Sequence, residues 1–267
     1  MLNDRLEVWQ IMPYSTVLSS NINTTDGILR CSRYAFGPNR LHYCGPDANR
    51  EIFSYIEAGA QNPGLEVLLK AFRTMFPYLK FIAQANRIKE PFDNRVVEAY
   101  WIGNELLENI DMNKFYRHLV EEHGLKKKLD GKSFERLTAK LRQGAVPTHS
   151  FHVFDVWRRT GHIEREHTLE SLDSCRISWG MVKKLDGPFI AVETEPLIYK
   201  NGKLVLGEPA LKKITRYFNT GIDIDELKAG DTVSVHWDVP CEVITQKQAQ
   251  ILRKYTLRHI QLANQTL

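Results

Sequence analysis

Two residues in the C-terminal third of the chain have the chemistry of metal ligands. Cys175 begins the segment Cys-Arg-Ile-Ser-Trp-Gly, and His236 ends the segment Gly-Asp-Thr-Val-Ser-Val-His. A thiol that can lose its proton and an imidazole that can stay neutral are the softest ligands that a protein offers to a transition metal. Each also has a structural explanation, because a lone Cys often packs as a small hydrophobe and a strand His is often satisfied within the protein.

A second candidate site surrounds Cys44, in the segment Tyr-Cys-Gly-Pro-Asp. Cys44 precedes a predicted helix, whose N–H groups and dipole favour a thiolate, whereas the nearby carboxylate of Asp47 opposes it. The segment 33–47 also contains Arg40 and His42, so it is either a binding loop or an aromatic-anchored connection. A tightly packed, unreactive Cys44 is the alternative to a reactive one.

A third candidate is the pair His149 and His152. Their spacing of three residues places both imidazoles on one face of a helix, whereas a strand would send them to opposite faces. As metal ligands the two are a weak pair alone. They gain weight only if the fold brings them near His42, Cys44 or His236.

Regular helix caps and stops organise the first half of the chain. Short polar side chains that can cap a helix precede stretches with apolar residues at helical spacing. The predicted helix starts are Asp47, Asp93, Asp111 and Ser133. The apolar run 65–85 adds a further helix, with Pro77 as a kink or a break. Gly37-Pro38 and Gly45-Pro46 interrupt the segment 33–47, which we therefore expect to be irregular.

The apolar period shortens after residue 147 and indicates strands. Thr245 and Gln248 then form a capping box that opens a C-terminal helix, and Asn201-Gly202 suits a type I′ hairpin turn. The predicted strands are 151–156, 177–183, 189–194, 197–200, 203–206 and 232–237. The expected fold is α+β: an all-helical domain, 1–147, followed by a small β-barrel or β-sandwich domain with a C-terminal helix, 148–267.

Composition excludes several classes of protein. The net charge is +4, from 36 basic and 32 acidic residues, and no basic block alternates with aromatic residues as in a nucleic-acid groove. Residues 1–18 contain charged side chains and fit neither a signal peptide nor a membrane span. Four cysteines without a Cys-x-x-Cys pair indicate reduced thiols rather than disulfides or a structural zinc site. We expect a cytoplasmic protein without nucleic-acid or membrane partners.

The C-terminal motifs resemble those of the small chaperones of [NiFe]-hydrogenase maturation, the HypC/HupF family. That family has Cys-x-x-Ile-Pro-Gly-x-Val, a strand with Asp-Gly, and Gly-Asp-x-Val-x-Val-His before a helix that contains Ala. The matching positions here are Cys175, Gly180, Val182, Asp186-Gly187, Gly230, Asp231, Val233, Val235, His236 and Ala249. Ser178 and Trp179 replace the Ile-Pro pair, and Cys175 lies in mid-chain rather than at the mature N-terminus.

The resemblance implies that residues 148–267 form a small OB-like β-barrel with a C-terminal helix, which carries an iron with cyanide and CO ligands. In the family, the Cys thiolate and the His help to pass this iron from the scaffold protein HypD to the hydrogenase large-subunit precursor. By motif, Cys175 would be the thiolate ligand and His236 the imidazole ligand or its neighbour. The N-terminal part resembles an uncharacterised bacterial family associated with hydrogenase gene neighbourhoods.

Three functions follow as alternatives. The first is a non-enzymatic accessory factor of [NiFe]-hydrogenase maturation, in which the helical domain binds a partner. The second is a thiol-dependent enzyme with Cys44 as nucleophile and His42, His149 or His152 as base. The third is a metal-free adaptor that has kept the β fold and lost the ligand role.

Overall fold

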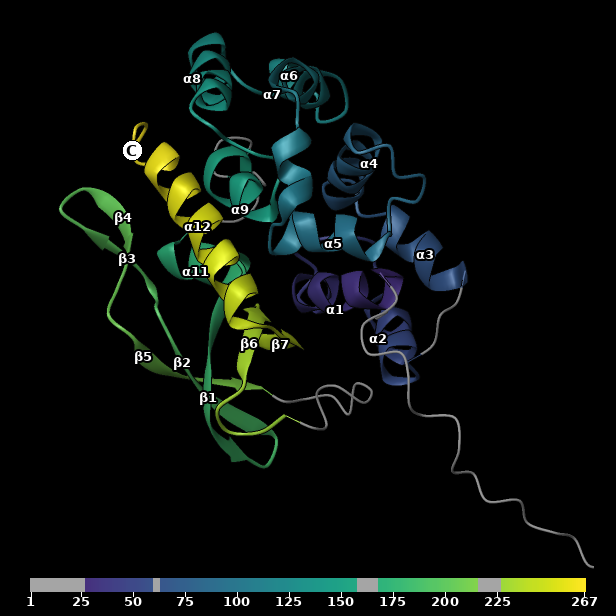
Figure 1. The fold of residues 1–267 in the computed structure, drawn as a ribbon, viewed down its shortest axis with the longest axis vertical. Helices are drawn as coiled ribbons and strands as arrows, with labels where there is room; N and C mark the ends of the chain where they lie inside the picture. The colour runs from purple at the N-terminus through teal and green to yellow at the C-terminus, as the bar shows by residue number, and fades with distance from the viewer. Residues whose placement is uncertain (1–26, 60–62, 158–167, 216–226) are drawn as a thin grey trace, which may run out of the picture.

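The computed structural model describes residues 27–59, 63–157, 168–215 and 227–267. The segment 1–18, for which the sequence predicts neither a signal peptide nor a membrane span, lies outside them. Helices come first, an antiparallel sheet follows, and a long helix ends the chain, so the predicted α+β class is confirmed (Figure 1). Among the described helices, none has the length and apolar character needed to span a membrane.

The helical part includes one 3₁₀ helix, η1, and one π-helix, η2. The helices are α1 (Gly27–Arg40), α2 (Asn49–Glu57), α3 (Pro63–Lys70), α4 (Met75–Ala85), α5 (Asn94–Trp101), η1 (Glu105–Asn109), α6 (Met112–Glu121), α7 (Leu125–Lys128), α8 (Gly131–Arg142), α9 (His149–Phe151), η2 (His152–Trp157), α11 (Leu169–Cys175) and α12 (Gln246–Ala263). Asp93 and Asp111 cap α5 and α6 as predicted, and Thr245 and Gln248 form the capping box of α12.

Five antiparallel strands form the main sheet, in the order β5-β2-β1-β6-β7, and β3 pairs with β4 in a separate hairpin. The strands are β1 (Ser178–Asp186), β2 (Phe189–Thr194), β3 (Leu197–Lys200), β4 (Lys203–Leu206), β5 (Ala210–Thr215), β6 (Thr232–His236) and β7 (Val239–Val243). The β3–β4 turn has positive φ at Asn201 and Gly202, as a type I′ turn requires. The sequence did not predict β5 and β7.

The predicted closure into a barrel is not found among the described strands. The order is open, with β5 and β7 at its two edges. The edges approach at one end, where the Thr215 N–H donates to the Asp238 carbonyl over 3.1 Å, but no ladder joins β5 to β7. The described strands therefore form an open antiparallel sheet whose two edges approach each other at one end. An OB-like barrel stays a prediction.

Two sequence predictions about local structure are wrong. Much of the supposedly irregular segment 33–47 belongs to α1, which includes Pro38 and has nearly all its residues buried, because tertiary packing outweighs the local cost of the proline. The predicted strand 151–156 is helical, in α9 and η2. Its aromatic and β-branched residues suit either state, and here Phe151, Val153 and Phe154 are fully buried.

Other predicted boundaries moved by a few residues. Ala48 rather than Asp47 is the N-cap of α2, and Asp130 rather than Ser133 caps α8. The apolar run 65–85 divides into α3 and α4, with Pro77 in the first turn of α4. Helical structure continues to Cys175, and the sheet begins only at Ser178. The division into domains at residue 147 stays a prediction.

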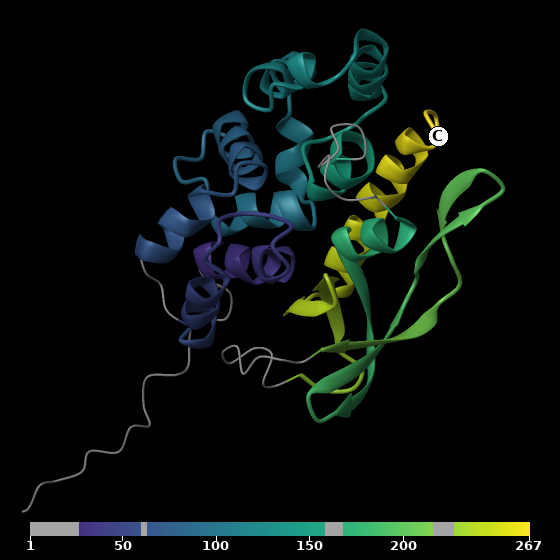
Figure 2. The same ribbon diagram turned by 180° about the vertical axis from the view of Figure 1, so that it is seen from behind.

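The largest hydrophobic core joins the two parts of the chain. It combines the apolar faces of the helices with Ile177, Cys241 and Ile244 around the sheet and with the buried face of α12. In both ribbon views α12 runs along the boundary between the helices and the strands (Figure 1, Figure 2). A smaller core covers the other face of the sheet and includes Val233 and Val235 of β6.

Candidate metal site

The alternation of side chains along β6 decides which way His236 points. Val233 and Val235 enter the small core of the sheet, so Ser234 and His236 face the opposite side. On that side lies α1, where the Ser234 hydroxyl contacts the Tyr34 hydroxyl at 2.8 Å. The imidazole of His236 therefore enters the interface between the sheet and the helical layer and is only 1% exposed.

The hydrogen bonding of His236 leaves one ring nitrogen with a lone pair. Nδ1 donates to the backbone carbonyl of Tyr34 over 2.7 Å, whereas the buried Nε2 has no hydrogen-bond partner. Burial is the largest effect on the pKa of His236 and lowers it to about 4. The hydrogen bond to the Tyr34 carbonyl and the nearby backbone of Cys175 raise the pKa, but by less. The ring is therefore neutral at pH 7, with its proton on Nδ1 and its lone pair on Nε2.

His149 enters the same space from α9. Its Nε2 donates to the Cys175 carbonyl over 2.9 Å, and its Nδ1 lies 3.3 Å from the Tyr100 hydroxyl. Burial is the main cause that holds the pKa of His149 well below its ordinary value, and His236 and His152 lower it further. Because Nε2 carries the proton, Nδ1 is the nitrogen that could coordinate a metal, at the expense of the hydrogen bond from Tyr100.

Cys175 is held at the junction between α11 and β1. Thr168 caps α11, and the fully buried Arg176 donates to the Asp173 carboxylate over 2.8 Å, which fixes the bend that follows the cysteine. The Ser174 carbonyl accepts the Trp237 N–H over 2.8 Å. Ser174 is thus tied to the turn after β6, and Arg176 is tied back to α11.

The environment of Cys175 keeps the sulfur protonated without a metal. Burial is the largest cause that raises the pKa of the Cys175 thiol, and Cys44 raises it further. The indole of Trp237 favours the thiolate, but its Nε1 lies outside hydrogen-bond geometry. A metal that binds here must therefore displace the thiol proton.

These three side chains converge. One potential ligand atom from each of His149, Cys175 and His236 lies within 4.8 Å of the other two, and no other such group of three or more is found in the part of the chain that the structure describes. Tetrahedral coordination by sulfur and nitrogen needs ligand atoms about 3.3–3.6 Å apart, so they would draw in by roughly 1 Å. The orphaned Nε2 and the thiol suit a thiolate- and imidazole-binding metal such as zinc, iron or cobalt.

A cavity of about 50 Å³ adjoins the three side chains. Its walls are mostly aromatic and apolar, so water has few partners there. They comprise Ala35, Pro38, Tyr43, Cys44, Phe72, Thr74, Met75, Tyr100, Trp101, His149, His152, Cys175, His236 and Trp237. A space of this size holds one or two small molecules the size of water beside an ion.

The other sequence candidates divide between this cavity and the surface. Cys44 and His152 line the cavity, while His42 is exposed and pairs with the exposed Asp47 over 3.2 Å. Arg40 donates to the Trp237 carbonyl over 3.2 Å. Segment 40–47 therefore connects α1 to α2 and contributes Cys44 to the cavity wall. Within the described residues, no hydrogen bond or ion pair is seen between His42 and Cys44.

The cavity wall contains residues that the sequence did not single out. Trp237 follows His236 in a turn with positive φ at Trp237 and Asp238, a costly conformation for such a bulky residue, and it stacks on Tyr43 with ring centroids 4.4 Å apart. Tyr100 and Trp101 read as ordinary core residues in the sequence. For these residues, the only signal in the sequence was that Trp237 directly follows His236, a candidate ligand.

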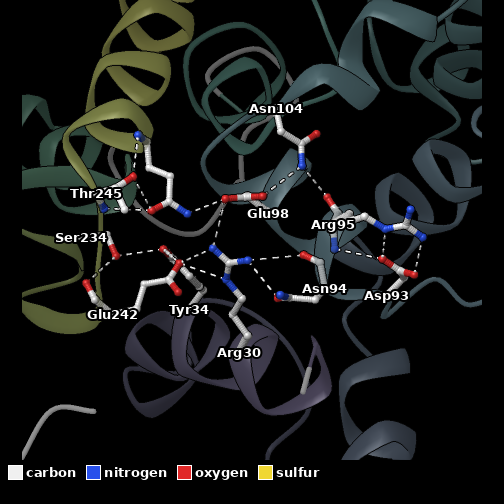
Figure 3. A network of polar contacts seen from close by, with 11 residues as sticks. Arg30, Tyr34, Asp93, Asn94, Arg95, Glu98, Asn104, Ser234, Glu242 and Thr245 are labelled. Atoms are coloured by element: carbon white, nitrogen blue, oxygen red, sulfur yellow. Dashed lines mark hydrogen bonds and ion pairs between the residues drawn. The ribbon is translucent and has the colours of Figure 1, made fainter. Parts of the chain in front are cut away.

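A buried polar network clamps α1 to the sheet beside the site (Figure 3). Arg30 of α1 pairs with Glu242 of β7 over 2.8 Å, and the Tyr34 hydroxyl donates to the same carboxylate over 2.7 Å. Arg30 also donates to Asn94 over 2.9 Å, so α5 joins the network. Each partner satisfies a buried charge or hydroxyl of another, which sets the register between α1 and β6.

The comparisons with known proteins return one family. Residues 23–267 match a family of unknown function, DUF6390. No curated protein matches the chain, and no solved structure does. The match contains no link to hydrogenase chaperones, so that resemblance stays a prediction.

Proposed function

Because the chain belongs to the family of unknown function DUF6390, we propose its function from its own site: it is an accessory protein that binds a transition metal through Cys175, His236 and His149. The observation that carries the proposal is the convergence of a thiol with a neutral imidazole whose Nε2 lone pair is unused. An unsatisfied buried acceptor is costly, and a metal ion would offset that cost.

Three protein ligands leave a coordination position open beside the cavity. Closed structural sites usually take four protein ligands, whereas sites that act on or hand over their contents keep a position free. His236 already has the outer hydrogen bond that orients most metal-binding histidines, through its Nδ1 and the Tyr34 carbonyl. This combination supports a site for holding and exchanging an ion rather than a purely structural one.

The motif resemblance extends the proposal to the identity of the cargo. We propose that the ion is iron and that the protein assists [NiFe]-hydrogenase maturation, with a HypD-type scaffold and a large-subunit precursor as partners. The ordered motifs from Cys175 to Ala249 and an antiparallel sheet followed by a C-terminal helix support this version. Cytoplasmic location belongs to the same proposal and is supported by four free cysteines.

The alternative of a thiol-dependent enzyme is less well supported, although Cys44 shares its cavity with His149 and His152. Burial raises the pKa of Cys44 to about 11, so the thiol is protonated near neutral pH and is a poor nucleophile. His42 points to the surface instead of toward it. Rapid, selective labelling of Cys44 by a thiol reagent at pH 7 would reverse this assessment.

Metal titration tests the proposal directly. The apo protein is titrated with Co²⁺, whose absorption reports thiolate and imidazole coordination, and with Zn²⁺ in competition. We expect one site per chain, lost in Cys175→Ala. Cys44→Ala is the matched control, because Cys44 lines the same cavity but lies outside the ligand group. This variant should bind Co²⁺ like the wild type. Equal binding by both variants, or no binding by the wild type, leaves the metal-free adaptor instead.

The hydrogenase version needs the native host. Tagged wild-type protein and Cys175→Ala are purified from hydrogenase-producing cells, and infrared spectra are recorded for cyanide and carbonyl stretches. We expect these bands and the two proposed partners with the wild type alone. Unchanged hydrogenase activity and iron loading in the Cys175→Ala strain would rule out this version without affecting the titration result.

A further inference from the structure

Helix α1 has a proline where an α-helix normally has a backbone donor. Pro38 has no N–H, so the carbonyl of Tyr34, four residues earlier, lacks the donor that an α-helix normally supplies to it. Both residues are buried, and a buried carbonyl without a donor is strongly disfavoured. The missing donor comes from the distant strand β6, as Nδ1 of His236 at 2.7 Å.

The neighbouring glycine allows this contact. A Cβ atom on Gly37 would lie 2.5 Å from the His236 carbonyl oxygen and 3.2 Å from the Cβ of Trp237. Any larger residue at position 37 would therefore push β6 away from α1. Gly37 sets how closely the strand approaches, and Pro38 leaves an acceptor for the imidazole that arrives there.

The consequence for His236 lies in its ring nitrogens. An imidazole that donates from Nδ1 keeps its lone pair on Nε2, the nitrogen of this ligand-group residue that has no hydrogen-bond partner. If the helix supplied its own donor to Tyr34, the carbonyl oxygen would accept two hydrogen bonds, and sharing the acceptor would weaken the one from His236. The opposite tautomer, with the proton on Nε2, would then become more accessible and could not bind a metal through Nε2.

We propose that Pro38 is a positioning residue for the metal site: it reserves the Tyr34 carbonyl for His236 and thereby holds the Nε2 lone pair toward the ion. The inference rests on the proposed function only in taking a transition metal as the ligand. It gives the helical layer a defined part in the site, since α1 selects the tautomer of a ligand that β6 carries.

The test restores the missing donor. Pro38→Ala introduces an N–H opposite the Tyr34 carbonyl, and Pro38→Val does the same while keeping most of the side-chain volume in the buried site. Pro77→Ala is the matched control, because Pro77 lies in the first turn of α4, where an N–H has no acceptor within the helix. Helical circular dichroism verifies that each variant folds.

The first measurement needs no metal. Ring ¹⁵N chemical shifts of the apo protein, assigned by comparison with His236→Gln, report which nitrogen carries the proton. We expect the Nδ1-protonated form in the wild type and Pro77→Ala, and a mixture of tautomers in both position-38 variants. A fully Nδ1-protonated His236 in those variants would overturn the inference, whether or not the protein binds metal.

The second measurement is the Co²⁺ dissociation constant. Loss of an outer partner of a metal-binding His typically weakens affinity 10–100-fold, so we expect about tenfold weaker binding in the position-38 variants and no change in Pro77→Ala. A shifted tautomer with unchanged affinity would also overturn the positioning role. A wild type that binds no Co²⁺ contradicts the proposed function, while the tautomer result still decides the role of Pro38 in orienting His236.

Discussion

Two groups of buried histidines in this molecule differ in what their ring nitrogens face. His118 and His123 meet through their Nε2 atoms at 3.2 Å, packed on Tyr78. His149 and His236 meet with ring centroids 4.9 Å apart, next to the Cys175 thiol. Burial is the main cause that lowers the pKa of His118 to about 3, and those of His123 and His236 to about 4. A depressed pKa is therefore common to both groups.

The groups are distinguished by hydrogen bonding. In the pair, one imidazole donates to the other, so the contact uses the lone pair of one Nε2 and the proton of the other. In the group of His149, Cys175 and His236, the Nε2 atom of His236 has no such partner, and a cavity adjoins the three side chains. An unused lone pair beside a thiol, rather than burial alone, marks a site that can accept an ion.

The largest expected difference between the groups is in metal affinity. His236→Gln removes one of three ligands, and we expect Co²⁺ binding to weaken by roughly 100-fold or more, beyond the loss typical of an outer partner. His118→Gln is the matched change in the other group and should bind Co²⁺ like the wild type. Titrations of both variants decide the matter, and equal losses would show that the comparison is wrong.

Acid stability should depend on the His118–His123 pair. The folded pKa values lie below the ordinary value of 6.5, so between about pH 6.5 and about 4 the unfolded chain binds more protons. This stability is complete above pH 6.5 and is lost as the pH falls through that window. Between pH 7 and pH 5, each histidine lowers the free energy of unfolding by about 1–2 kcal/mol.

Urea unfolding between pH 7 and pH 5 measures this effect. The control is the double variant His118→Gln/His123→Gln, which should be less stable at pH 7 and lose less stability on acidification. Proton NMR of the imidazole rings gives an independent check. Titration of either ring near pH 6.5 in the folded protein would contradict the assigned burial effect.

The clamp between α1 and β7 should affect stability more than ligand chemistry. Tyr34→Phe removes a hydroxyl that donates to Glu242 and contacts Ser234, and it leaves those buried groups less satisfied. We expect a loss of about 1–3 kcal/mol in the free energy of unfolding by urea. The Tyr34 carbonyl remains, so the His236 tautomer should be unchanged in ring ¹⁵N spectra. Tyr43→Phe changes a cavity-lining tyrosine that is not among the residues of the Arg30–Tyr34–Glu242 network, and it is the control.

The smallest expected effect concerns His149. Its Nδ1 is engaged by the Tyr100 hydroxyl at 3.3 Å, and Tyr100→Phe removes this competitor while keeping the ring. We expect Co²⁺ affinity to rise by a few fold, since a neutral hydrogen bond contributes about 1 kcal/mol. Tyr78→Phe, an equally buried tyrosine beside the other pair, should leave affinity unchanged. Weaker binding in Tyr100→Phe would show that the hydroxyl supports the ligand.

Local signals in the sequence predicted the elements that local chemistry controls. The capping side chains of Asp93, Asp111 and Thr245 predicted helix starts that the structure confirms, because a cap is satisfied within one turn. Alternation and turn residues likewise predicted β2, β3 and β4 with their bounds. Edge strands β5 and β7 went unpredicted, since a solvent-facing, lysine-rich strand and a strand with a proline carry weak patterns.

The candidate site was only partly predictable. The sequence by itself determined which residues could bind a metal, because thiol and imidazole chemistry belongs to the side chains, and so Cys175, His236 and His149 were candidates before any fold was known. Only the tertiary structure brought them within 4.8 Å of one another. Their distance depends on packing between elements far apart in the chain, for which no local pattern exists.

The Gly37-Pro38 dipeptide shows the same division. Its local chemistry predicts a break in regular structure, and that prediction was wrong because most of α1 is buried and continues through it. Tertiary structure instead supplies a close neighbour for the glycine and a donor for the carbonyl that the proline leaves open. The sequence determined that a backbone donor is missing at position 38, and the fold decided that His236 replaces it, because only long-range packing can bring β6 to α1.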